Sequence, residues 1–196
     1  DIEATDEQKI IFYTGLYHVL MQPNTMSDVA AQFVRDMLLH HDTYGYLPIW
    51  DLWGQENYCM IGNHAIPVLS DAILAELPDI DVEKTYRAMV ESSTRSHYNS
   101  PFEVWEKHGY MPQNLQNMSV SITLEQAFDD WCVAAVAKKL GKTAYYERFH
   151  KRSESYRNLF HKESGFFRPK NDKGEWVEPF DPLSYEEPCF IEGNAW

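Results

Sequence analysis

The sequence predicts an all-α domain of 196 residues in which long loops join the helices. Two observations lead to this fold class. Apolar residues recur at helical spacing along much of the chain, and no alternation of strands with helices indicates a parallel sheet. With 44% hydrophobic residues, a chain of this length can bury one core, so residues 1–196 are expected to form a single domain.

Two helices are predicted before the first long loop. The first covers residues 6–21, where apolar side chains repeat with the period of a helix. The second covers residues 27–41 and is expected to bury Phe33. We interpret the adjacent His40 and His41 as ordinary basic residues at its C-terminal end.

Two further helices follow this loop. The third is marked by four apolar residues and stops near Pro78. Asp81 is then placed to cap a fourth helix over residues 82–95. The apolar positions of the third helix are Ile66, Leu69, Ile73 and Leu77.

The last two helices are predicted to form an antiparallel hairpin. Thr123 and Gln126 fit the S/T-x-x-E/Q capping box, and Gly141 lies just past the end of that helix. Its partner, residues 143–160, follows after only a few residues, and short connections favour antiparallel neighbours. Beyond it the chain is rich in proline, glycine and aromatic residues, with room for one small β-hairpin near 166–178.

Charge and composition exclude several classes of partner. The 30 acidic and 17 basic residues give a net charge of −13, which repels nucleic acids and anionic membrane surfaces. No apolar run approaches the roughly 18 residues of a membrane span, and the acidic start of the chain does not resemble a signal peptide. The three cysteines form no CxxC pair and the histidines no HExxH motif, so no structural zinc site is expected.

The stretch GYLPIWDLWGQENYCMIGNH, residues 45–64, sets carboxylate, amide and imidazole groups among aromatic rings. A sugar needs both, since its C–H faces stack on rings and its hydroxyl groups require hydrogen-bonding partners. Alternatively, the aromatic residues fill space beneath the loops. The candidate sugar-binding residues are Trp50, Asp51, Trp53, Gln55, Glu56, Asn63 and His64, together with Trp196 at the end of the chain.

Glycosidic hydrolysis typically uses two carboxyl groups, and this acidic chain offers many candidates. Asp129 and Asp130 are adjacent within a predicted helix. We interpret them as structural, either solvated or capping a neighbouring loop. Composition alone does not choose the catalytic pair.

Several longer motifs are more specific. The segments FYTGLYHVLMQPNTMSDV, GYLPIWDLWGQENYCMIGNHAIPVLSDA, TLEQAFDDWCVA and EGNAW, in this order, resemble the catalytic domain of glycoside hydrolase family 92. The resemblance implies a bacterial, calcium-dependent exo-α-mannosidase, often α-1,2-specific, that inverts the anomeric centre. It also implies an (α/α)6 barrel, a mannose-containing oligosaccharide or N-glycan as substrate, and a periplasmic or secreted location.

The resemblance assigns the general acid to Glu192, in the motif EGNAW. Protonating a leaving oxygen requires a neutral carboxyl group, and an apolar wall such as Trp196 raises a carboxyl pKa by desolvation. Trp196 is therefore expected beside the acid.

Two departures from the family pattern stand out. A stretch that in the family carries a mannose-binding aspartate is missing between Val29 and Ala30, so the barrel is expected to be internally shortened. The counterparts of the general base and of the acidic residues near calcium are not found. We therefore assign no metal ligand and expect no calcium binding by this chain alone.

Three functional hypotheses remain open. The chain is part of an α-mannosidase with weak or no turnover on its own, a non-catalytic carbohydrate-binding remnant, or a helical structural module. Self-association through the open side of a partial barrel is expected if an apolar face is exposed there.

Overall fold

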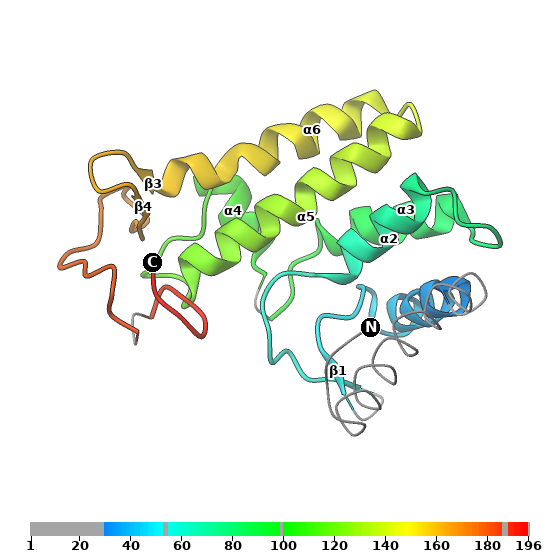
Figure 1. Cartoon of the computed structure of the whole chain (residues 1–196), viewed down its shortest axis with the longest axis horizontal. Helices are drawn as coiled ribbons and strands as arrows, with labels where there is room; N and C mark the ends of the chain where they lie inside the picture. Colours follow the sequence, from blue (N-terminus) through cyan, green and yellow to red (C-terminus); the bar gives the residue numbers. More distant parts are fainter. Residues whose placement is uncertain (1–29, 53–54, 99, 186–187, 196) are drawn as a thin grey trace, which may run out of the picture.

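The computed structural model describes residues 30–52, 55–98, 100–185 and 188–195, which are mainly helical (Figure 1). The helices are segment 30–44, α2 (Ala65–Leu74), α3 (Val82–Ser92), α4 (Phe102–His108), α5 (Ser119–Lys139), α6 (Thr143–Ser153) and the 3₁₀ helix η1 (Glu154–Leu159). The strands are β1 (Asp51–Leu52), β2 (Gln55–Glu56), β3 (Phe160–His161) and β4 (Phe166–Phe167). The all-α prediction is confirmed, and the helix predicted at 6–21 lies outside the described residues.

The central element is α5, which lies against α6 on one side and α2 and α3 on the other (Figure 1). The predicted hairpin of α5 and α6 is confirmed, with Gly141 at φ +68° just after α5. A glycine takes this left-handed conformation without the clash that a Cβ would cause. The main core lies between these helices and includes Leu69, Met89, Val133, Val136 and Phe149, all fully buried.

A buried ion pair ties α6 to α5. The guanidinium of Arg152 donates to both carboxylate oxygens of Asp130, each at 2.6 Å, and also to the carbonyl oxygen of Ser93. Burial raises the pKa of Asp130 to about 6, although hydrogen bonds from Arg152 act in the opposite direction. Asp130 is therefore not solvated, because the hairpin covers it completely.

The prediction for the start of α5 was wrong by one turn, since the helix begins at Ser119 and not near Thr123. The backbone N–H groups of Met118 and Val120 donate to the carbonyl oxygens of Pro188 and Cys189, so a distant segment caps this end. Thr123 instead accepts a hydrogen bond from the N–H of Met111 in the interior. The first backbone N–H groups of α5 therefore find acceptors without a capping box.

The first half of the chain follows the predicted pattern with local corrections. Asp81 caps α3 by accepting a hydrogen bond from the N–H of Lys84 at 2.9 Å. In segment 30–44, Phe33 is exposed and Val34 is buried instead, because the buried stripe is rotated by one residue. His40 and His41 are both buried, since the helix continues past them.

The β-structure agrees with the prediction in part. β3 and β4 form the antiparallel hairpin, with Phe160 opposite Phe167. Within the predicted range, Lys170 and Trp176 form a single antiparallel bridge. The neighbouring Pro169 has no N–H group to extend a ladder. None of the helices in the described ranges has the length and apolar character needed to span a membrane.

Candidate active site

The first half of α5 forms a common support for two segments that are far apart in sequence. The N–H of Asn63 donates to the carboxylate of Asp129 at 2.7 Å, and Nε2 of His64 lies 3.2 Å from Oε2 of Glu125. Nearer the start of α5, Oγ of Ser121 accepts a hydrogen bond from the N–H of Ile191 at 3.0 Å. Ser121 is one turn, about 6 Å along the axis, from Glu125 and about two turns from Asp129, so the His64 loop and the segment before Glu192 attach within about two turns of each other.

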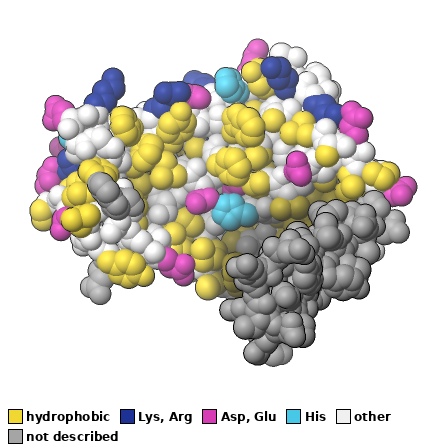
Figure 2. Space-filling model, viewed as in Figure 1, with side chains coloured by type: hydrophobic (Ala, Val, Ile, Leu, Met, Phe, Trp, Pro, Cys, Tyr) yellow, Lys and Arg dark blue, Asp and Glu magenta, His cyan; other side chains and the backbone are white. Residues whose placement is uncertain are grey.

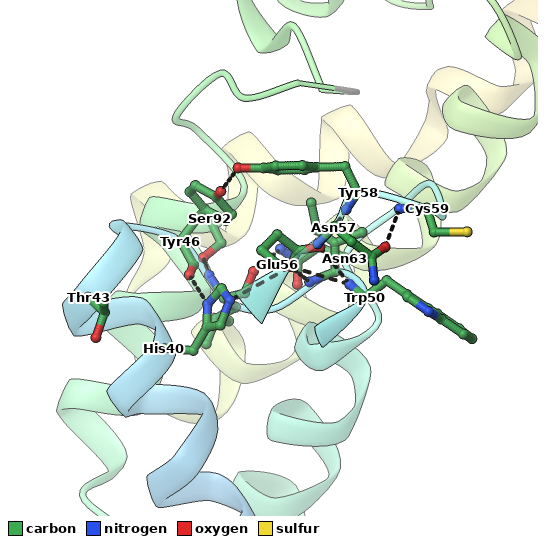
Figure 3. Close-up of polar contacts among 12 residues, drawn as sticks. His40, Thr43, Tyr46, Trp50, Glu56, Asn57, Tyr58, Cys59, Asn63 and Ser92 are labelled. Atoms are coloured by element: carbon green, nitrogen blue, oxygen red, sulfur yellow. Dashed lines mark hydrogen bonds and ion pairs between the residues drawn. The ribbon is translucent and has the colours of Figure 1, made fainter. Parts of the chain in front are cut away.

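Loop 45–64 is built around the carboxylate of Glu56 (Figure 3). This side chain is 2% exposed, and it accepts hydrogen bonds from four backbone N–H groups. The carboxylate thus joins the residues just before β1 to those just after β2, at the end of the strand pair where Asp51 pairs with Glu56. The four donors are the N–H groups of Ile49, Trp50, Asn57 and Tyr58.

Aromatic and histidine rings pack against one another within and beside this loop. The ring of Tyr46 stacks on that of His97 with centroids 4.9 Å apart, and its hydroxyl group contacts the hydroxyl of Tyr58. Burial lowers the pKa of His97 to about 4, and burial also lowers the pKa of His40. Both histidines are therefore neutral at pH 7 and act as packing groups.

A hollow of about 480 Å³ opens beside the loop. Trp50, Asp51 and His64 contribute to its lining. Trp50 is half exposed, so its ring is accessible. The other side chains of the lining are mixed, with apolar groups and two more polar ones: Phe33, Asp36, Met37, His40, Pro48, Ile49, Ala65 and Val68. The hollow thus combines an open aromatic ring with carboxylate and imidazole groups.

His64 lies between two carboxyl groups at the start of α2. Its Nδ1 atom is 3.9 Å from Oδ1 of Asp129, in addition to the Glu125 contact of Nε2. Asp129 is completely buried, and this burial raises its pKa well above the ordinary value. Gly62 permits the close approach, because a Cβ there would lie 3.1 Å from the Glu125 side chain and from the His64 ring.

The remaining predicted site residues are distributed as follows. Asn63 is buried and its side chain donates to the carbonyl oxygen of Leu47 at 3.1 Å, while Gln55 is exposed. Glu192 is exposed and does not line the hollow. Trp53 and Trp196 lie outside the described residues.

Sequence reasoning missed Glu125 and assigned Asp129 only a general structural role. Asp129 caps the neighbouring loop through Asn63, as one of our two alternatives predicted, but it is not solvated. One signal was available for Glu125, because residues 125 and 129 are four apart and therefore share a helix face.

Comparison with known proteins decides the family. The model of the "Glycosyl hydrolase family 92 catalytic domain" matches residues 28–196. The chain belongs to glycosyl hydrolase family 92. The predicted resemblance is confirmed, and the helices described above are part of the (α/α)6 barrel of this family.

Two solved mannosidases of family 92 resemble this chain in structure. The alpha-mannosidase BT3965 from Bacteroides thetaiotaomicron is 39% identical with a TM-score of 0.82, over 86% of this chain and 23% of BT3965. It has also been solved in complex with mannoimidazole. The inverting mannosidase BT2199 from the same species is 31% identical with a TM-score of 0.81, over 86% of this chain and 24% of BT2199.

A fungal relative extends the comparison beyond bacteria. The "Uncharacterized secreted glycosidase" of Arthroderma benhamiae is 27% identical over 220 residues, which cover 94% of this chain and 27% of the relative. This family 92 chain thus spans about a quarter of the length of the relatives it matches.

The calcium ion used by family 92 does not find a ligand set in this part of the domain. Among the described residues, no group of three or more histidine, cysteine, aspartate or glutamate side chains is arranged to hold a metal. Calcium prefers six to eight oxygen ligands, and the buried carboxylates here are already engaged with Asn63 and Arg152.

Proposed function

We propose that this chain forms one wall of an α-mannosidase active site and that its hollow binds the terminal mannose of a mannose-containing oligosaccharide or N-glycan. The observation that carries the proposal is the joint attachment of loop 45–64 and the Glu192 segment to the first half of α5. Family membership and the mannosidase relatives support the substrate class.

Each group of the hollow has a role that suits a sugar. The accessible ring of Trp50 packs against a C–H face of mannose, and Asp51 and His64 accept or donate hydrogen bonds to its hydroxyl groups. Glu125 orients the imidazole of His64 through the 3.2 Å contact. Glu56 contributes indirectly, because its carboxylate is occupied by backbone donors and fixes Trp50 in place.

Glu192 acts as the general acid in this proposal. Its motif, EGNAW, is where the family resemblance places the acid, and the preceding residue is fixed to Ser121 of α5. The leaving oxygen of the glycosidic bond receives the proton of this carboxyl group.

The 196 residues alone are expected to bind mannosides with little or no turnover. An inverting reaction needs a second carboxylate roughly 6.5 to 9.5 Å from the acid to activate water, and we find no counterpart of the family's base. Preference for α-1,2 linkages, dependence on calcium and secretion are proposed for the whole protein. The secreted fungal relative supports the last of these.

The test has two measurements. Mannoimidazole is titrated into the chain, and hydrolysis of α-1,2-mannobiose is followed with added calcium. We expect the chain to bind mannoimidazole. Trp50→Ala and His64→Ala should each weaken this binding about tenfold, because each removes one stacking or hydrogen-bonding partner. Trp50→Phe keeps an aromatic ring and should largely retain the affinity.

The outcomes separate the hypotheses. Binding without hydrolysis supports the proposal, whereas turnover comparable to that of an intact mannosidase would contradict the missing base. Slow turnover that Glu192→Gln abolishes would show that another carboxylate of this chain substitutes. No binding at all would favour a helical structural module.

A further inference from the structure

A second hollow, of about 390 Å³, lies at the start of α5. It is formed by the loop QNLQNM, residues 113–118, and by Tyr98. Tyr98 is 74% exposed, so its ring is free to receive a ligand. No lysine, arginine, aspartate or glutamate belongs to the lining, which distinguishes this hollow from the rest of a strongly acidic surface.

The amide groups of this loop divide into two kinds. Asn114 is engaged at both ends, since its Nδ2 donates to Asp172 at 3.0 Å and its Oδ1 accepts from the N–H of Asp172 at 2.9 Å. The side chains of Gln116 and Asn117 make no hydrogen bond within the described part of the chain. Each therefore presents a free donor and a free acceptor.

The backbone of the loop is held in place before any ligand binds. The N–H of Gln113 donates to the carbonyl oxygen of Lys170 at 2.8 Å, and the N–H of Met118 donates to that of Pro188 at 2.6 Å. A loop fixed at both ends loses little conformational entropy on binding. The second contact also ties the loop to the segment that leads to Glu192.

A ring contact links this second hollow to loop 45–64, which also contributes to the first hollow. The rings of Tyr58 and Tyr98 lie 5.6 Å apart between centroids, and the N–H of Tyr58 is one of the donors to Glu56. The amide hollow is thus connected to loop 45–64 through Tyr98 and to the Glu192 segment through Met118.

We infer that this hollow is an extension subsite for a neutral sugar residue of the oligosaccharide beyond its terminal mannose. Paired donors and acceptors of amides match vicinal hydroxyl groups, the Tyr98 ring matches a C–H face, and the absence of charge in the lining disfavours anionic or cationic ligands. The inference rests on the proposed function of the first hollow, because the extension follows a mannose bound there.

Titration of the full chain with mannose, α-1,2-mannobiose and α-1,2-mannotriose tests this subsite, with affinities taken from NMR shift changes. Wild type is expected to bind mannotriose about tenfold more tightly than mannose. Tyr98→Ala and the double variant Gln116→Glu/Asn117→Asp are expected to remove this gain while leaving mannose affinity unchanged. Tyr98→Phe keeps the ring and is expected to keep the gain.

A control variant accounts for the added negative charge. Thr143→Asp/Ala144→Glu adds the same two charges at exposed positions of α6, outside both hollows, and should keep the gain with ligand length. Equal affinity of wild type for mannose and mannotriose would overturn the subsite and leave the proposed function intact. A gain that survives in Tyr98→Ala and in the double variant would also overturn it, and failure to bind any of the three sugars would count against both proposals.

Discussion

The carboxylate of Glu56 offers a direct test of how loop 45–64 is held. The substitution Glu56→Gln keeps the shape of the side chain but replaces one oxygen with an NH2 group and removes the charge. Oε2 accepts from the N–H of Ile49 at 2.7 Å, and Oε1 accepts from the N–H groups of Asn57 and Tyr58 at 3.0 and 2.9 Å. Whichever way the amide turns, at least one buried donor faces another donor.

The magnitude follows from these hydrogen bonds. A hydrogen bond to a charged group contributes about 1.5 to 3 kcal/mol, and an unsatisfied buried donor costs about 1 to 3 kcal/mol. Loss of one acceptor and weakening of the others should lower the free energy of unfolding by about 3 kcal/mol. With a urea slope of about 1 to 3 kcal/mol per molar, the midpoint should fall by at least about 1 M.

Urea unfolding followed by circular dichroism measures this change, and titration with mannoimidazole measures its effect on the site. Glu147→Gln is the control, because Glu147 is exposed on α6 and a surface change of this kind stays within about 0.5 kcal/mol. We expect Glu56→Gln to lose stability and ligand affinity together. A variant as stable as the control would refute the role of this carboxylate as the support of the loop.

Three further predictions concern α5. Arg152→Met leaves Asp130 buried without its partner and should cost about 3 to 5 kcal/mol, whereas the double variant Arg152→Met/Asp130→Leu should recover much of this loss in the same unfolding assay. The pKa of Asp129 is raised on folding, so above about pH 4 the folded chain binds a proton at this carboxyl group that the unfolded chain does not. The contribution of Asp129 to the free energy of unfolding is therefore complete below about pH 4 and is lost as the pH rises through the folded pKa. Asp129→Asn should therefore gain stability relative to wild type as the pH rises from 4 to 7, and a difference independent of pH would contradict the raised pKa. Phe128 and Trp131 are half exposed and stacked on each other, and Figure 2 shows hydrophobic side chains gathered on one face of the molecule. Light scattering should show self-association that Phe128→Ser/Trp131→Ser reduces, and a strict monomer would exclude it.

Local sequence patterns predicted those features that depend on neighbouring residues. The period of Ile66, Leu69 and Ile73 located α2, and all three are buried, whereas the fourth predicted position, Leu77, lies past the end of the helix at Leu74. Asp81 was recognised as a cap because its acceptor lies three residues from its donor. The short connection at Gly141 predicted the antiparallel hairpin, because the residues that determine it are also close in sequence.

Features that depend on distant segments were not predicted. The start of α5 is set by carbonyl groups of Pro188 and Cys189, about seventy residues further along the chain, and no local cap marks it. The role of Glu56 likewise depends on a turn that brings the N–H groups of Ile49 and Trp50 to its carboxylate. The composition of loop 45–64 predicted that Glu56 binds sugar. The sequence alone does not reveal that its carboxylate already accepts hydrogen bonds from the backbone.

The adjacent aspartates of α5 show how one helix supports both the fold and the site. Consecutive residues on an α-helix point about 100° apart, so Asp129 faces loop 61–64 while Asp130 faces α6. Asp129 accepts from Asn63 and lies beside His64, and Asp130 pairs with Arg152. The position of His64 is therefore fixed by a helix that is itself fixed by the hairpin. This series of contacts gives the proposed mannose-binding hollow a rigid side, since loop 45–64 takes its place from α5 and from the Glu56 carboxylate.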